Sequence, residues 1–183
     1  MSAFVELVLA EGYESVSVGD IVRRANVGRS TLYSHYSSKE ALLAESLQRP
    51  CAGLAACTQS DTTPQRLIPL LDHFREQHHL NRVFFENPVR QLWIRQLAVS
   101  IERAVGPHGR TIREQKGVPR FLLASVIAEM QIALIVHWLT DATFVKSEVI
   151  AGALVFNTCA MLERPPQESR RNEGYSDRPR RSV

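Results

Sequence analysis

The stretch Val27–Glu40, VGRSTLYSHYSSKE, gathers hydroxyl side chains with one arginine and one histidine, and it holds little aliphatic bulk. If it contains a helix, the helical period of about 3.6 residues turns Leu32 and Tyr36 inward. The outward face then consists of Arg29, Ser30, Tyr33 and Ser34. Arginine can read guanine through paired hydrogen bonds, serine can reach several base edges, and hydroxyl groups and histidine can hold phosphates. We therefore expect a helix face that contacts DNA, with an ordinary solvated face as the alternative.

A tight turn is expected directly before this helix. Ser17 followed three residues later by Asp20 is the pattern of a capping box, which starts a helix near Val18. That helix should run to about Ala25, because Asn26 tolerates the left-handed conformation that ends a helix. Two short helices joined by such a turn form the helix-turn-helix arrangement, although an αα-hairpin without a ligand has the same spacing.

Further helices are expected on both sides of this pair. An amphipathic helix at the N-terminus should end at Gly12, which suits the position after a helix. Gly28 can serve as the N-cap of the second helix of the pair, which should end near Tyr36. After it, Ser37 and Glu40 form another capping-box pattern, and Pro50 should kink or break the helix that they open.

The remaining sequence favours an all-α fold, because glycine and proline are sparse and lie mostly between apolar runs. Further helices are expected at about residues 63–78, 88–105, 119–141 and 146–163. Residues 164–183 are rich in proline, arginine and serine and have almost no apolar content, so we expect a disordered basic tail.

The net charge of +3 does not by itself indicate nucleic-acid binding. Residues 1–49 hold five Lys/Arg against six Asp/Glu, residues 50–163 hold eleven against ten, and residues 164–183 hold six against three. The positive excess therefore lies in the tail. Any DNA contact by the N-terminal part must depend on where individual side chains are placed.

The segment VSVGDIVRRANVGRSTLYSHYSSKEALL, residues 16–43, resembles the DNA-binding motif of the TetR-type transcriptional repressor family. The family pattern is S/T, a short aliphatic residue, x-x-I-A-x-x-A-G-V-S-x-G-T-L-Y-x-H-F-x-S-K-E-x-L. The match is carried by Ser17, Val18, Ile21, Ala25, Val27, Thr31, Leu32, Tyr33, His35, Ser38, Lys39, Glu40 and Leu42. The sequence departs from the pattern at Asn26, Gly28 and Ser30, where the family usually has Gly, Ser and Gly.

This resemblance implies roles for individual residues and partners for the chain. It implies base contacts by Arg29, Ser30 and Ser34. It implies phosphate contacts by Ser17, Thr31, Tyr33, His35 and Lys39. It also implies a homodimer that binds double-stranded DNA at a two-fold symmetric operator, and a small-molecule effector held by the C-terminal helices.

The apolar segment Phe121–Leu139 is about long enough to span a bilayer. Glu129, Gln131 and His137 interrupt it, so we expect a buried helix of a soluble protein and no membrane partner. A helix that is apolar nearly all round must be covered on all sides. A partner subunit is the simplest cover for one side, and a single central helix in a monomer is the alternative.

Aromatic and scattered polar residues in the middle helices could line an effector pocket, with plain core packing as the alternative for each aromatic. The pocket candidates are Phe74, Phe85, Trp93, Glu129, Met130, His137 and Trp138. No metal or other cofactor is expected, since His73 and His78 stand five residues apart and do not share a helix face. Three cysteines without a C-x-x-C pair favour a reduced, cytoplasmic compartment.

These observations predict an all-α chain with three parts. Residues 1–48 form a three-helix helix-turn-helix DNA-binding domain, residues 49–163 form a helical effector-binding and dimerisation domain, and residues 164–183 form the tail. The predicted function is a ligand-responsive DNA-binding regulator, most simply a repressor released from its operator by an effector. We do not expect an enzyme, because the sequence offers no nucleophile–base pair or metal spacing. The alternatives are an all-α small-molecule-binding protein or a helical protein-interaction module.

Overall fold

The computed structural model describes residues 1–59, 61–76, 87–106, 117–142 and 144–162, and every regular element in these ranges is a helix. Four helices make up the N-terminal part and the connection that leaves it: α1 (Ser2–Glu11), α2 (Val18–Ala25), α3 (Arg29–His35) and α4 (Lys39–Ala55). The remaining elements are the short 3-10 helices η1 (Ala56–Thr58) and η2 (Pro64–Arg66), then α5 (Ile68–Glu76), α7 (Val89–Val105), α9 (Arg120–Asp141) and α10 (Ser147–Met161). The expected all-α class is confirmed.

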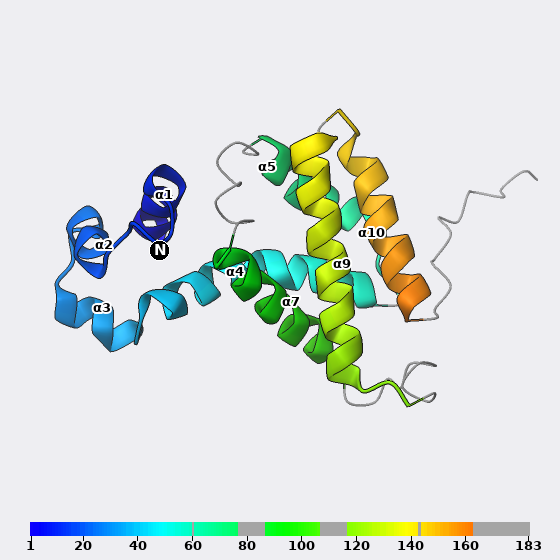
Figure 1. Cartoon of the computed structure of the whole chain (residues 1–183), viewed down its shortest axis with the longest axis horizontal. Helices are drawn as coiled ribbons and strands as arrows, with labels where there is room; N and C mark the ends of the chain where they lie inside the picture. The colour runs from blue at the N-terminus through cyan, green and yellow to red at the C-terminus, as the bar shows by residue number, and fades with distance from the viewer. Residues whose placement is uncertain (60, 77–86, 107–116, 143, 163–183) are drawn as a thin grey trace, which may run out of the picture.

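The N-terminal helices lie at one end of the molecule, and α4 runs from them into the helical domain (Figure 1). Helix α2 packs against both α1 and α3. Each of the three buries apolar side chains from one face and leaves the other exposed, which is the arrangement expected for short amphipathic helices. The buried side chains are Phe4 and Val8 of α1, Ile21 of α2 and Leu32 of α3.

In the helical domain, α7 packs against α4 on one side and α9 on the other, and α10 packs against α5, α9 and the two 3-10 helices. Figure 1 shows α9 and α10 running side by side on the outer part of this domain. Cys51 and Cys57 are buried in the core, and burial raises the pKa of each thiol to about 12. Both thiols are therefore protonated at neutral pH and pack as small apolar groups.

The expected N-cap of α4 is wrong, and the helix does not break at Pro50. Its N-cap is Ser38, whose hydroxyl accepts a hydrogen bond from the Ala41 amide at 3.2 Å, and the expected cap Ser37 lies one residue outside. Pro50 does not end the helix, which continues to Ala55. Proline removes one backbone hydrogen bond. The buried side chains of Leu47 and Leu54, on either side of Pro50, hold the two halves against the core and offset that loss.

Other helix boundaries lie closer to the positions expected from the sequence. Helix α2 has the expected bounds, and α7, α9 and α10 begin and end within about two residues of the expected positions in the described ranges. Pro64 opens a 3-10 turn, and the α-helix proper starts only at Ile68. The expected tail at 164–183 lies outside the described residues.

Helix α9 is long and apolar enough to cross a bilayer by length and composition, and half of its most apolar window is buried inside the protein. A core helix of a soluble protein passes the same test. The alternative of a single central helix buried within a monomer does not fit, because one side of α9 stays uncovered in a single copy. Phe121, Leu122 and Val126 are exposed, with Phe121 at 63% of its full accessible area.

Candidate nucleic-acid interface

The first helix of the pair starts with the capping box that its sequence predicts. The Ser17 hydroxyl accepts a hydrogen bond from the Asp20 amide at 3.2 Å, and the Asp20 carboxylate accepts one from the Ser17 amide at 3.0 Å. The hydrogen bonds that the Asp20 carboxylate accepts from the Ser17 hydroxyl and amide hold its pKa below the ordinary value of 3.8. Two amides at the start of α2 are thereby satisfied, which fixes where the helix begins.

The turn between α2 and α3 depends on Asn26. Its backbone has φ 53° and ψ 47°, the left-handed conformation expected from the sequence. The Asn26 amide donates to the Arg23 carbonyl at 3.3 Å, and the Val27 amide donates to the Val22 carbonyl at 3.0 Å. Asparagine tolerates this conformation better than most residues, which explains why the turn forms where the family usually has glycine.

Helix α3 presents a polar face to solvent. Leu32 points into the core and is 8% exposed, whereas Tyr33 is 53% exposed. The exposed residues of this helix are Arg29, Ser30, Thr31, Tyr33, Ser34 and His35. The seven-residue helix contains no acidic side chain. The charge of Arg29 is therefore not offset within the helix itself, although residues 1–49 as a whole carry no positive excess.

Two side chains of α3 already have defined positions. The Ser34 hydroxyl donates to the Thr31 carbonyl at 2.8 Å, so its oxygen stays free to accept a hydrogen bond. Arg29 lies across the first turn of α2: a Cβ placed on Gly19 would stand 3.3 Å from the Arg29 Nη2 atom and 3.4 Å from the Ser17 Oγ atom. Gly19 thus leaves the space that Arg29 occupies.

The Lys39 side chain already forms hydrogen bonds within the protein. Its ammonium donates to the Tyr13 carbonyl at 2.8 Å and to the Val16 carbonyl at 3.0 Å. The same nitrogen lies 4.3 Å from the centroid of the Tyr13 ring. Two of its three N–H donors are thus used inside the protein, where they tie the segment between α1 and α2 to the start of α4. The expected phosphate contact remains a prediction that rests on the third donor.

A second link joins the end of α3 to α4. The Tyr36 hydroxyl donates to the Glu45 Oε1 atom at 2.9 Å, and this hydrogen bond raises the pKa of Tyr36. Sequence reasoning placed Tyr36 inward but missed Glu45 as its partner. It also missed Tyr13, Val16 and Gly19, because no spacing rule connects residues that meet only through the fold.

The expected pocket residues that the structure describes lie in several different places. Phe74 and Trp93 are buried and meet edge to face, with ring centroids 6.1 Å apart. Trp138 is buried in the core and donates to the Val145 carbonyl at 2.9 Å, and Met130 is half-buried against the core. Phe85 lies outside the described residues.

Glu129 and His137, which were among the pocket candidates, face solvent. The Glu129 carboxylate is 3.9 Å from the Arg90 guanidinium, and His137 is 3.3 Å from Asp141. Both side chains are more than half exposed. Because the sequence of α9 is apolar nearly all round, it gave no indication of which side of the helix faces solvent.

The α2–turn–α3 geometry, with a capped first helix and a second helix that exposes its polar face, is the helix-turn-helix arrangement found in DNA-binding proteins. Residues 1–46 match the family described as bacterial regulatory proteins, tetR family. The N-terminal part of the chain is therefore similar to the DNA-binding region of TetR-family transcriptional regulators.

Two curated relatives from Bacillus subtilis strain 168 are both named uncharacterized HTH-type transcriptional regulators. YxbF is 46% identical over 52 residues, which is 27% of this chain and 13% of YxbF. YhgD is 24% identical over 160 residues, which is 78% of this chain and 84% of YhgD. The first match is therefore confined to a small part of its relative, and the second extends through most of both proteins.

Solved structures share the whole architecture. A TetR transcriptional regulator from Streptococcus agalactiae 2603V is 26% identical with a TM-score of 0.56, and the match covers 86% of this chain and 89% of that one. A TetR-family regulator from Streptomyces coelicolor is 17% identical with a TM-score of 0.61, over 88% and 91%. FadR from Thermus thermophilus, solved with lauroyl-CoA, is 18% identical with a TM-score of 0.50, over 94% and 97%.

Proposed function

We propose that the protein is a dimeric repressor that binds a two-fold symmetric operator and is released by a small-molecule effector. The observation that carries this proposal is the exposed, acid-free polar face of α3. In a dimer, two copies of α3 would enter successive major grooves about 34 Å apart. A protein that binds an operator on the chromosome acts in the cytoplasm, so we also propose a cytoplasmic location.

Within each half-site, we assign the base contacts to Arg29, Ser30 and Ser34. Ser34 would accept a hydrogen bond from a base amino group, because its own hydrogen is donated to Thr31. Arg29 would have to leave its place beside Gly19 to reach a guanine. The phosphate contacts are assigned to Ser17, Thr31, Tyr33, His35 and the third donor of Lys39. Because phosphate contacts release counterions, affinity should fall steeply with salt.

The dimer is proposed to form through α9 and α10. Their outer faces expose large apolar side chains that a soluble monomer would leave in water, namely Phe121, Leu122, Val126, Val149 and Phe156. On α10, a Cβ added to Gly152 would meet no atom within 4 Å, so a partner helix could approach closely there. A second copy of the same face is the simplest cover that also supplies two-fold symmetry.

The effector is proposed to act on α4, which crosses from the 1–48 domain into the 49–163 domain without a break. An effector can shift the spacing of the two α3 helices only if it binds one arrangement of the dimer more tightly than the other. The Tyr36–Glu45 hydrogen bond supports this route, because a movement of α4 would reach the end of α3.

Selection of bound DNA from a random pool by the full chain tests the proposal. The expected result is enrichment of an inverted repeat whose half-sites are about one helical turn apart. A pool that stays random at low salt would rule out sequence-specific binding and leave the interaction-module alternative. Enrichment of a single unrepeated site would rule out the symmetric dimer.

A further inference from the structure

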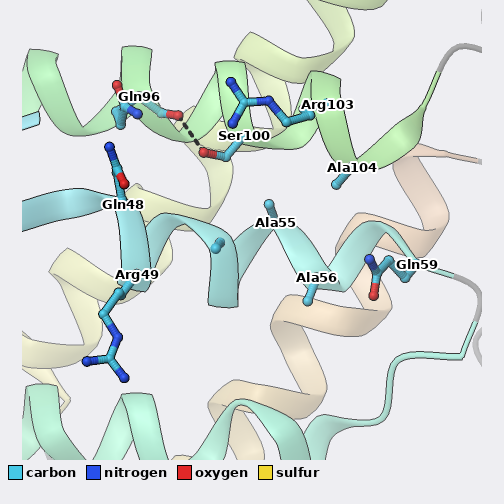
Figure 2. Close-up of a pocket in the computed structure, with 10 residues that line it drawn as sticks. Gln48, Arg49, Ala55, Ala56, Gln59, Gln96, Ser100, Arg103 and Ala104 are labelled. Atoms are coloured by element: carbon cyan, nitrogen blue, oxygen red, sulfur yellow. Dashed lines mark hydrogen bonds between the residues drawn. The ribbon is translucent and has the colours of Figure 1, made fainter. Parts of the chain in front are cut away.

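A cleft of about 560 Å³ lies between α4 and α7, on the solvent side of their contact (Figure 2). Its floor is made of small apolar side chains, Ala52, Ala55, Ala56 and Ala104. Its walls are polar and come from both helices and from the residue after η1, namely Gln48, Arg49, Gln59, Gln96, Ser100 and Arg103. None of the aromatic pocket candidates lines it, so this cleft is separate from the Phe74–Trp93 core.

The polar groups of the cleft are available to a ligand. Among the described residues, the amides of Gln48, Gln59 and Gln96 and the guanidinium of Arg103 have no hydrogen-bond or ion-pair partner. Only the Ser100 hydroxyl is engaged, and it donates to the Gln96 carbonyl at 2.9 Å within α7. Three primary amides offer both donors and acceptors on the two sides of one cleft.

The charge of the lining selects the ligand class. Among the described residues that line the cleft there is no carboxylate, whereas two are arginines. In Figure 2, Arg49 extends from α4 on the side away from α7, and Arg103 lies along α7 beside Ser100. Arg103 is therefore the cation placed to receive an anionic group between the helices, since a guanidinium matches the oxygens of a carboxylate or phosphate.

We propose that this cleft binds a small polar anion, a carboxylate or phosphate that also carries hydroxyl groups. Arg103 would hold the anionic group, and Gln48 and Gln96, which face each other across the cleft in Figure 2, would bond the hydroxyl groups. Because Gln48 belongs to α4 and Arg103 to α7, a bound anion connects the helix that carries the DNA-binding domain to the helical domain. This coupling to α4 rests on the proposed function, whereas the binding itself does not.

Nuclear magnetic resonance on the ¹⁵N-labelled full chain tests the binding. The probes are malate and glycerol 3-phosphate, with glycerol as the uncharged control. The expected result is saturable shifts of the side-chain amide signals of Gln48 and Gln96 and of the Arg103 Nε–H signal. Saturation with only one of the two anions identifies the carboxylate or the phosphate as the group bound. Shifts that grow linearly with both anions, or equal shifts with glycerol, would overturn the proposal.

Two variants and one control variant test the location of the site. Arg103→Gln should weaken probe binding by about tenfold, the loss expected for one charge-assisted hydrogen bond. Arg95→Gln, an exposed arginine on the same helix outside the cleft, should leave it unchanged. Ala52→Leu should block the cleft without changing any charge, which keeps the test decisive if Arg103→Gln does not fold. Equal effects of the two arginine variants, or full binding by Ala52→Leu, would overturn the site.

A second measurement tests the coupling to α4. On an operator obtained by selection, saturating probe should change the affinity of the wild-type protein several-fold and leave the Arg103→Gln protein unaffected. Saturable binding with unchanged operator affinity would overturn the coupling to α4 and still support anion binding in the cleft. Failure to obtain any operator would count against the proposed function, and the spectra alone would then decide the site.

Discussion

Lys39 and Tyr13 are joined in two ways: the lysine ammonium donates to the Tyr13 carbonyl at 2.8 Å and lies 4.3 Å from the centroid of the tyrosine ring. The same ammonium donates to the Val16 carbonyl at 3.0 Å. The segment between α1 and α2 has no regular structure of its own, and these contacts hold it against the start of α4. The position of α2, and through the turn that of α3, is thereby fixed relative to α4.

Lys39→Met should therefore destabilise the protein as well as weaken DNA binding. Two carbonyls lose their donor, which costs about 1–3 kcal/mol where they are shielded from water. Urea unfolding followed by circular dichroism measures the loss. Lys146→Met, at an exposed lysine, should change stability by much less. If Lys39→Met unfolded at the wild-type urea concentration and still lost DNA affinity, the main role of Lys39 would be the phosphate contact.

Arg29→Ala should relax the preference for one base of the operator by about 1–3 kcal/mol, as expected when a bidentate base contact is lost. Tyr33→Phe should weaken binding to every sequence alike, because its hydroxyl is assigned to a phosphate. Titrations of the operator and its single-base variants by fluorescence anisotropy separate the two outcomes. Uniform weakening by Arg29→Ala at all positions would move Arg29 to the phosphate contacts.

Gly19→Ala tests the same arginine without removing it. The added methyl group would lie 3.3 Å from the Arg29 guanidinium, so that flexible side chain must shift. Since alanine favours the helix over glycine by about 0.5–1 kcal/mol, we expect equal or higher stability together with an altered base preference. The same titrations measure the base preference. An unchanged preference would show that the position of Arg29 in the free protein does not bear on base reading.

The capping box should make part of the stability of α2 depend on pH. The pKa of Asp20 is lowered in the folded protein, so the carboxylate stabilises the fold at pH values above its ordinary value of 3.8. That contribution is lost as the pH falls through the lowered pKa. Urea midpoints should therefore separate wild type from Asp20→Asn at pH 7, and the gap should narrow as the pH falls below 3.8. Glu11→Gln, an exposed acid at the end of α1, serves as the control, and a pH-independent gap for Asp20→Asn would contradict this account.

Phe156→Asp should dissociate the proposed dimer, because it places a charge in the middle of the apolar α9–α10 face, where Phe156 is 60% exposed in a single chain. Light scattering after size exclusion measures the mass. Phe144→Asp is the matched control, since Phe144 is 84% exposed and lies outside both helices. Wild-type protein that runs as a monomer at micromolar concentration would contradict the assignment of this face.

Several features of the DNA-binding domain were determined by the sequence alone. The capping box of Ser17 and Asp20, the left-handed Asn26 and the burial of Leu32 all depend on residues within one or two helical turns of each other. Local hydrogen bonds and the helical period set such features, so the sequence predicted α2 and α3 almost residue by residue. The expected cap Ser37 was wrong because its neighbour Ser38 also offers a hydroxyl, and the Ser38 hydroxyl accepts the hydrogen bond from the Ala41 amide.

Only the tertiary structure decided what the long side chains do. Lys39 stands 26 residues from Tyr13, and no periodicity connects them, so nothing in the sequence indicated this contact. The phosphate contact of Lys39 came from the family resemblance and stays a prediction. Glu129 and His137 were placed in a pocket because their helix is apolar, whereas its packing against α7 and α10 turns both to solvent. The cleft between α4 and α7 had no sequence signal, because its polar lining comes from segments that meet only when the chain is folded. Contacts at fixed short spacing can be read from a sequence, and contacts across the chain depend on how the helices pack.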